Sequence, residues 1–140
     1  MAETTSLAAV LIVALAACSA SGPRGRWADL PPDGSIGTLA RVYDEAWTRA
    51  VVACPYDTPA QLTTRTGRDW AGPDLSARDD AQVVVLLDHG RLVGTETVPC
   101  ERVDLCRQDL GDLAPDALVE VRVEDGTPVV SRPASQPASG

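Results

Sequence analysis

The sequence predicts an α+β fold, in which a small and mainly antiparallel sheet of about five strands carries one or two short helices on one face. Three observations lead to this prediction. Residues 83–87 form a continuous apolar run, residues 118–124 alternate between apolar and charged or polar side chains, and residues 58–61 have the composition of a helix start. At 140 residues, with 44% hydrophobic and 23% charged residues, the chain has the size and balance of one globular domain with appendages.

The first half of this domain is expected to begin with a helix and a strand. Residues 36–44 are predicted to form a short helix behind Ser35 as its cap, because Leu39 and Tyr43 are four residues apart and would share one face. Residues 47–54 are predicted to form a buried strand, which the proline that follows would end.

A second short helix is expected after this strand. Thr58 is an N-cap residue, Pro59 occupies the first helical position and Gln61 completes a capping box. Gly67 is the predicted end of the helix, since glycine adopts the left-handed conformation that closes many helices.

The second half of the domain is predicted to consist of two hairpins. The apolar run 83–87 suits a central strand covered on both faces, and the turn His89-Gly90 returns the chain as an antiparallel strand over residues 92–98. Residues 118–124 alternate, with Val119, Val121 and Val123 on one side, and Asp125-Gly126 then turns the chain into a strand over residues 127–131. Pro128 confines that last strand to a sheet edge.

The N-terminus has the features of an export signal. Residues 7–17 are eleven uncharged apolar residues, fewer than the roughly 20 that a membrane-spanning helix needs. The four residues that end this segment, Leu15-Ala16-Ala17-Cys18, resemble the lipobox of bacterial lipoproteins. The resemblance implies cleavage after Ala17 and a diacylglyceryl group on the Cys18 thiol. The segment before residue 7 departs from the pattern, because its only charged side chain is that of Glu3.

Four parts of the chain are therefore expected. They are a lipoprotein signal peptide (1–17), a Gly/Pro/Ser-rich tether (18–35), a globular α+β domain (36–131) and a disordered tail (132–140). Two large apolar side chains within the tether are expected to dock on the domain, those of Trp27 and Leu30.

The cysteines indicate one disulfide. With Cys18 assigned to lipid, an odd number remains, namely Cys54, Cys100 and Cys106, and three pairings are open. The long loop between Cys54 and Cys106 favours that pair, because closing it stabilises the fold by ~4 kcal/mol in the chain-entropy model against ~2.5 kcal/mol for Cys100 with Cys106. Cys100 is then the unpaired thiol. The spacing matches neither a redox Cys-x-x-Cys motif nor a zinc site.

The other candidate residues favour structural roles. His89, the single histidine, is expected to be an exposed turn residue. Most acidic residues of the most closely spaced group are expected to be solvated loop residues. The alternatives are a divalent-ion site and a glycosidase-type pair of carboxyl groups. The group consists of Asp79, Asp80, Asp104, Asp109, Asp112 and Asp116. Three aromatic residues near the capped helix suit core and rim packing better than a ligand-stacking patch: Trp47, Tyr56 and Trp70.

The charge balance bears on partners. All twelve basic residues are arginines scattered along the chain, and twenty acidic residues give a net charge of -8, which argues against nucleic-acid binding. No nucleotide, protease or hydrolase motif occurs, so no cofactor, metal or catalytic residue is expected.

A longer stretch of the chain resembles a known kind of protein. The residues Trp47-x-Arg49-x-Val51-Val52-x-Cys54-Pro55-Tyr56, followed by the capped helix and the 83–98 hairpin, are similar to small lipoproteins of actinobacteria, over about residues 44–106. Such proteins have no assigned activity, so the resemblance implies no catalytic residue. We expect a lipid-anchored domain on the outer face of the cell membrane that binds an envelope protein or ligand; the alternatives are a small envelope hydrolase and a secreted protein without lipid.

Overall fold

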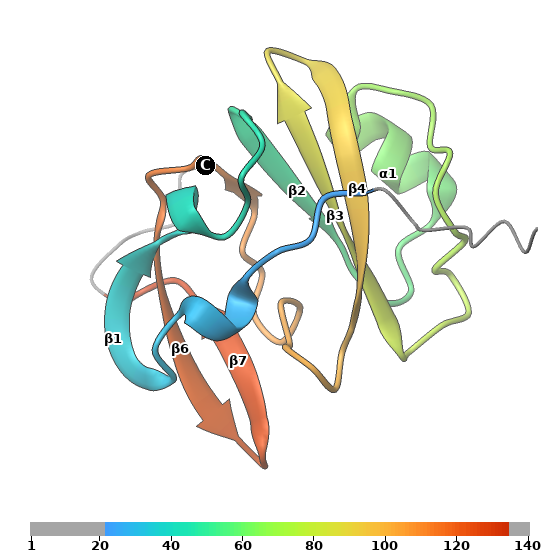
Figure 1. The fold of residues 1–140 in the computed structure, drawn as a ribbon. Helices are drawn as coiled ribbons and strands as arrows, with labels where there is room; N and C mark the ends of the chain where they lie inside the picture. Colours follow the sequence, from blue (N-terminus) through green and yellow to red (C-terminus); the bar gives the residue numbers. More distant parts are fainter. Residues whose placement is uncertain (1–21, 135–140) are drawn as a thin grey trace, which may run out of the picture.

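The computed structural model describes residues 22–134, which form two antiparallel sheets and one α-helix (Figure 1). One sheet has three strands in the order β1–β6–β7, with bounds Asp33–Thr38, Leu118–Glu124 and Thr127–Ser131. The other has four strands in the order β4–β3–β2–β5, with bounds Arg91–Pro99, Ala81–Asp88, Arg49–Ala53 and Asp112–Leu113. Helix α1 spans Pro59–Thr66, and two 3-10 turns span Trp27–Asp29 and Leu39–Arg41.

These elements form three layers. Figure 1 shows the three-stranded sheet on one side of the four-stranded sheet and α1 on its other side. The α+β class is as predicted, but the strands divide into two sheets instead of one sheet of about five strands. The larger core lies between the sheets, and a smaller one lies between the four-stranded sheet and α1.

Strand β3 is buried on both faces, as the continuous apolar run predicted. Val84 and Leu86 belong to the core between the sheets. Val83 and Val85 point the other way and pack in the smaller core with Leu62 of α1. A strand in the middle layer has no face in water, so alternation of apolar and polar residues is lost.

Helix α1 begins and ends where the sequence predicted. The Thr58 hydroxyl accepts a 3.2 Å hydrogen bond from the Gln61 backbone N–H, and the Gln61 side chain accepts a 2.9 Å bond from the Thr58 backbone N–H. Gly67 closes the helix at φ 70°, in the left-handed region.

Both predicted hairpins are confirmed. His89-Gly90 joins β3 to β4, and Asp125-Gly126 joins β6 to β7, with positive φ at all four residues. Strand β7 is an edge strand, as Pro128 predicted. Val123 is an exception to the predicted alternation, since it is 54% exposed where the hairpin extends past the core.

The predicted helix over residues 36–44 is wrong. Residues 33–38 form strand β1, in which Ile36 lies opposite Glu120 of β6, and a 3-10 turn follows. Leu39 and Tyr43 are both buried, as their spacing predicted. They do not share a helix, because Leu39 lies in the 3-10 turn and Tyr43 in the segment that follows it. Gly37 weakens a helix here, and β6 supplies the backbone hydrogen bonds that a helix would have made internally.

The folded domain begins earlier and ends later than predicted. Trp27 and Leu30 are buried in the core between the sheets, so most of the segment expected to be a tether belongs to the domain. Arg132, expected in a disordered tail, donates hydrogen bonds to the backbone oxygens of Leu110 and Asp112. The predicted signal peptide and Cys18 lie outside the described residues. Within residues 22–134, no helix has the length and hydropathy to cross a membrane.

Candidate functional site

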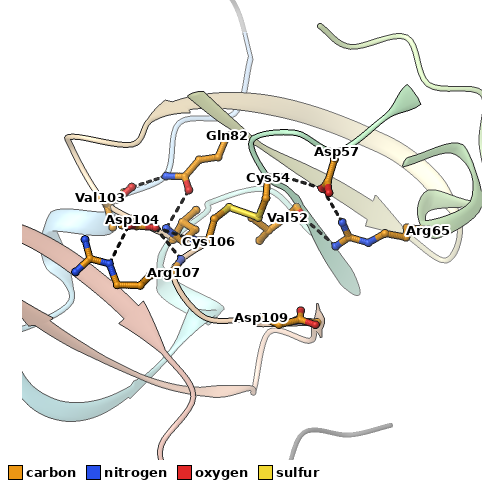
Figure 2. The surroundings of a disulfide bond; sticks show 12 residues. Val52, Cys54, Asp57, Arg65, Gln82, Val103, Asp104, Cys106, Arg107 and Asp109 are labelled. Carbon is orange, nitrogen blue, oxygen red and sulfur yellow. Dashed lines mark hydrogen bonds and ion pairs between the residues drawn. A yellow bond between two sulfur atoms is a disulfide. The ribbon is translucent and has the colours of Figure 1, made fainter. Parts of the chain in front are cut away.

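The candidate site is centred on the disulfide between Cys54 and Cys106, which Figure 2 shows with its surroundings. Cys54 follows the last residue of β2, and Cys106 lies in the loop between β4 and β5. Their Cα atoms are 5.7 Å apart, and 52 residues separate them in the sequence. The pairing that loop entropy favoured is therefore the one present, and Cys100 is left as a free thiol.

An ion pair fixes the Cys54 side of this site. One oxygen of Asp57 accepts the Cys54 backbone N–H at 2.8 Å and pairs with Arg65 of α1 at 3.1 Å. The same guanidinium donates a 2.8 Å bond to the backbone oxygen of Val52 (Figure 2). The end of β2 and the end of α1 are thus joined through Arg65.

A buried amide fixes the Cys106 side. The Gln82 side chain of β3 is fully buried, donates to the backbone oxygen of Val103 and accepts the backbone N–H of Leu105 at 3.0 Å. The carboxylate of Asp104 accepts the backbone N–H groups of Cys106 and Arg107, both at 2.9 Å (Figure 2). These bonds satisfy the buried polar groups of an irregular loop. The role of Gln82 could not be predicted, because one polar residue beside an apolar run does not indicate its hydrogen-bond partner.

The same loop also reaches the three-stranded sheet. The backbone N–H of Asp104 donates to the backbone oxygen of Pro128 at 2.8 Å, and the backbone oxygen of Asp104 accepts the backbone N–H of Val130 at 2.9 Å. Because the loop is bonded to β7 on one side and to β3 and Cys54 on the other, it links the two sheets. This arrangement indicates a structural role for the disulfide.

Cys100 lies close to this disulfide without sharing in it. The three cysteines line one open hollow of about 340 Å³, together with Tyr56 and Asp104. Partial burial raises the pKa of the Cys100 thiol, and the negative charges of Asp104, Asp80 and Asp79 raise it further. A thiol with a raised pKa is a poor nucleophile at neutral pH, so Cys100 is not activated for exchange with the disulfide.

The predicted acidic residues do not gather into one cluster. Asp80 pairs with Arg78 at 3.0 Å, and Asp112 pairs with Arg49 at 2.8 Å. Asp109 accepts the backbone N–H of Gly111 in a tight turn, and Asp116 is exposed. Across residues 22–134, no three side chains among His, Cys, Asp and Glu are arranged to hold a metal ion.

Two hollows are lined by three carboxylates each. One, of about 580 Å³, is lined by Asp79, Asp80 and Glu101, and Asp80 there pairs with Arg78. Asp57, Asp109 and Asp112 line a space of about 440 Å³ beside the disulfide, together with Arg65. Two of the three are in ion pairs with arginine and the third closes a turn, so each has a structural partner. The arrangement therefore gives no support to a pair of carboxylates acting as acid and base.

The histidine and the aromatic residues are dispersed. His89 is 83% exposed in the β3–β4 turn, with Nδ1 2.9 Å from Asp88. Trp47 is buried between the sheets, whereas Trp70 packs against the smaller core on the far side of the four-stranded sheet. Tyr56 is 64% exposed. The predicted packing role is confirmed for Trp47 and Trp70 and is wrong for Tyr56, which belongs to neither core.

An apolar hollow lies beside Trp70. It has a volume of about 160 Å³ and lies between strands β3 and β4 on one side and the end of α1 with the segment that follows it on the other. Its lining includes Thr66, Trp70, Val85, Leu92 and Thr95. Leu92 is 48% exposed, and its neighbour Val93 is 36% exposed. The sequence alone does not reveal this hollow, because its lining comes from three separate segments.

A buried carboxyl group ties the N-terminal segment to β4. Glu96 is 7% exposed and accepts the Gly25 backbone N–H at 2.8 Å, the Trp27 indole N–H at 3.1 Å and the Tyr43 hydroxyl at 2.8 Å. The rings of Trp27 and Tyr43 meet edge to face, 5.9 Å apart. Residues 25–27 are thereby held on the domain.

Comparison with known proteins found no matching family model, no matching curated protein and no matching solved structure.

Proposed function

We propose that this protein is an exported lipoprotein, held at the outer face of the cytoplasmic membrane by a lipid on Cys18, and that its domain is a binding module of the envelope. The observation that carries the proposal is the position of Cys18, directly after eleven uncharged apolar residues, of which the last two are the small residues Ala16 and Ala17. Two acyl chains hold a soluble domain at a bilayer durably, where a single chain binds only marginally.

The cysteines support an exported location. The bond between Cys54 and Cys106 suits an oxidising compartment, since cytosolic reductants keep most protein thiols reduced. The bond packs against the core between the sheets, and Gln82 and Asp104 hold the loop that carries Cys106.

The distribution of polar groups supports binding over catalysis. Beside the disulfide, Asp57 and Asp112 pair with arginines and Asp109 closes a turn. Within residues 22–134, the ion-pair partner of the exposed His89 ring is Asp88. The apolar hollow at Trp70 has the size of a small side chain or a few methyl groups.

Metabolic labelling tests the anchor. Cells that express the protein are fed an alkyne-bearing fatty acid, and label on the purified chain is measured. The wild type and Cys100→Ala, which removes the free thiol, are expected to carry label, and Cys18→Ala is expected to lose it. Label that persists in Cys18→Ala overturns the proposal.

Intact mass separates lipidation from simple secretion. A mature chain that begins at Cys18 and carries acyl groups is heavier than the bare polypeptide by the mass of the lipid. A bare mature chain in the medium would instead identify a secreted protein.

A further inference from the structure

We propose that the domain faces the bilayer with the outer edge of β4 and the hollow beside Trp70, so that Leu92 and Val93 lie at the membrane surface. This inference rests on the proposed lipid on Cys18 and adds the face of the domain that meets the lipid.

The described chain begins on β4. A Cβ atom built on Gly22 would lie 3.3 Å from the Thr95 backbone oxygen, and one built on Gly94 would lie 2.6 Å from Pro23. Gly25 is then bonded to Glu96. Figure 1 shows this N-terminal segment leaving β4 and crossing to the three-stranded sheet. The chain therefore enters the fold at the free edge of the four-stranded sheet.

The connection from this entry point to the anchor is short. Cys18 precedes Gly22 by four residues, which span at most about 14 Å when fully extended. A compact domain of this size has a radius of gyration of about 13 Å and hence a diameter of roughly 34 Å. Because this link is shorter than the diameter of the domain, it restricts which face of the domain can lie on the bilayer. A flexible tether that extended through residue 35 would leave the orientation free.

The surface near the entry point is apolar. Leu92 lies three residues from Thr95 on the same strand, about 10 Å away. It is 48% exposed, Val93 is 36% exposed, and both lie next to the β3–β4 turn. Leu92 and Trp70 line the same hollow, and tryptophan is a residue that favours the interface between lipid and water.

The charge near this face is balanced. Arg68 and Asp69 line the hollow, and Arg91 lies opposite Asp88 in the hairpin, so positive and negative side chains are equal in number there. The whole chain carries -8, which an anionic membrane repels. At the tip of the other hairpin, Glu124 pairs with Arg107 at 2.7 Å and Asp125 is exposed. Arginines offset acidic side chains at both hairpins, so the choice of the β4 face rests on the entry point of the chain and on the apolar surface beside it.

Depth-dependent quenching tests the orientation. Full-length lipidated protein, whose lipid on Cys18 is verified by intact mass, is reconstituted into vesicles of brominated phosphatidylcholine, which quenches tryptophan at the bilayer. The variants are Leu92→Trp and the control Val123→Trp, at an exposed apolar site on the β6–β7 hairpin. The emission added by each new tryptophan is compared between brominated and unbrominated vesicles.

In brominated vesicles, we expect the tryptophan of Leu92→Trp to lose most of its emission and the tryptophan of Val123→Trp to keep its emission. Val93→Trp provides the same measurement if Leu92→Trp does not fold. Equal quenching at both hairpins, quenching at Val123→Trp alone, or no quenching at either site overturns the inference. A lipidated chain without quenching at β4 refutes the orientation alone, whereas a chain without lipid on Cys18 refutes the proposed function as well.

Discussion

The Tyr43 hydroxyl donates a 2.8 Å hydrogen bond to the buried carboxyl group of Glu96, 53 residues further along the chain. The same oxygen of Glu96 accepts the Trp27 indole N–H. Burial raises the pKa of Tyr43 well above its ordinary value, and the nearby charge of Glu96 adds to the shift. Tyr43 therefore stays a donor throughout the physiological pH range, and Glu96 connects two N-terminal segments to β4.

Replacing Glu96 is expected to destabilise the domain strongly. Glu96→Ala leaves the Tyr43 hydroxyl and the Trp27 indole buried without an acceptor, at a cost of about 3 kcal/mol in the free energy of unfolding. Urea denaturation followed by circular dichroism measures this loss. The exposed Glu101→Ala serves as the control and is expected to leave the midpoint unchanged. An unchanged midpoint in Glu96→Ala would mean that these hydrogen bonds add nothing to stability.

Removing the disulfide is expected to lower the free energy of unfolding by about 4 kcal/mol, because the bond closes a long loop in the unfolded chain. The variant Cys54→Ser with Cys106→Ser is compared with Cys100→Ser in chemical denaturation. Cys100→Ser should behave like the wild type, and adding a reductant should lower the stability of the wild type toward that of the double variant. Equal stability of the double variant and the wild type contradicts the linking role of this loop.

The thiol of Cys100 is expected to react slowly with iodoacetamide at neutral pH. Its pKa is raised in the folded state, first by burial and then by Asp104, so the reactive thiolate forms only at more alkaline pH than in an ordinary cysteine. The pH–rate profile of the folded protein should therefore lie to the alkaline side of the profile measured in urea. Coincident profiles would exclude this environment for Cys100.

The same raised pKa has a consequence for stability. The folded chain holds the Cys100 proton more tightly than the unfolded chain does, so the contribution of this group to stability is complete below the unfolded pKa. It is lost as pH rises from the unfolded pKa through the folded one. The free energy of unfolding of Cys100→Ser, measured by urea denaturation at a series of alkaline pH values, should therefore fall less steeply with pH than that of the wild type.

The cap of α1 is expected to contribute measurably to stability. Thr58→Ala removes the acceptor of the Gln61 backbone N–H and should cost about 1 kcal/mol. Thr64→Ala, at an exposed position inside the same helix, is the matched control; alanine favours helix, so this variant should be no less stable than the wild type. Thermal unfolding compares the two, and equal losses would argue against a specific role of the cap.

Much of the local structure could be predicted because neighbouring residues decide it. The turns at His89-Gly90 and Asp125-Gly126 need only two residues that tolerate positive φ. The start of α1 depends on Thr58 and Gln61, three residues apart. The pairing of Cys54 with Cys106 agrees with the preference for a long loop over the short one between Cys100 and Cys106. Loop length does not separate it from Cys54 with Cys100, which closes a loop of similar length, so the fold made that choice.

The errors arose where a distant segment decides the outcome. The spacing of Leu39 and Tyr43 correctly indicated two buried side chains, but pairing with β6 made the preceding residues a strand instead of a helix. Trp27 was expected to dock, yet its acceptor, Glu96, could not be identified, because nothing near either residue specifies the other.

The sequence by itself determined the two hairpins, the capped helix, the buried character of β3 and the pattern at Cys18 from which we infer export. Only the tertiary structure decided that the strands divide into two sheets, that Gln82 and Asp104 hold the disulfide loop between them, and that the chain enters the fold at β4. The physical reason is range: turns, caps and loop lengths depend on a few adjacent residues, whereas the packing of one sheet on another depends on surfaces assembled from segments far apart in the chain.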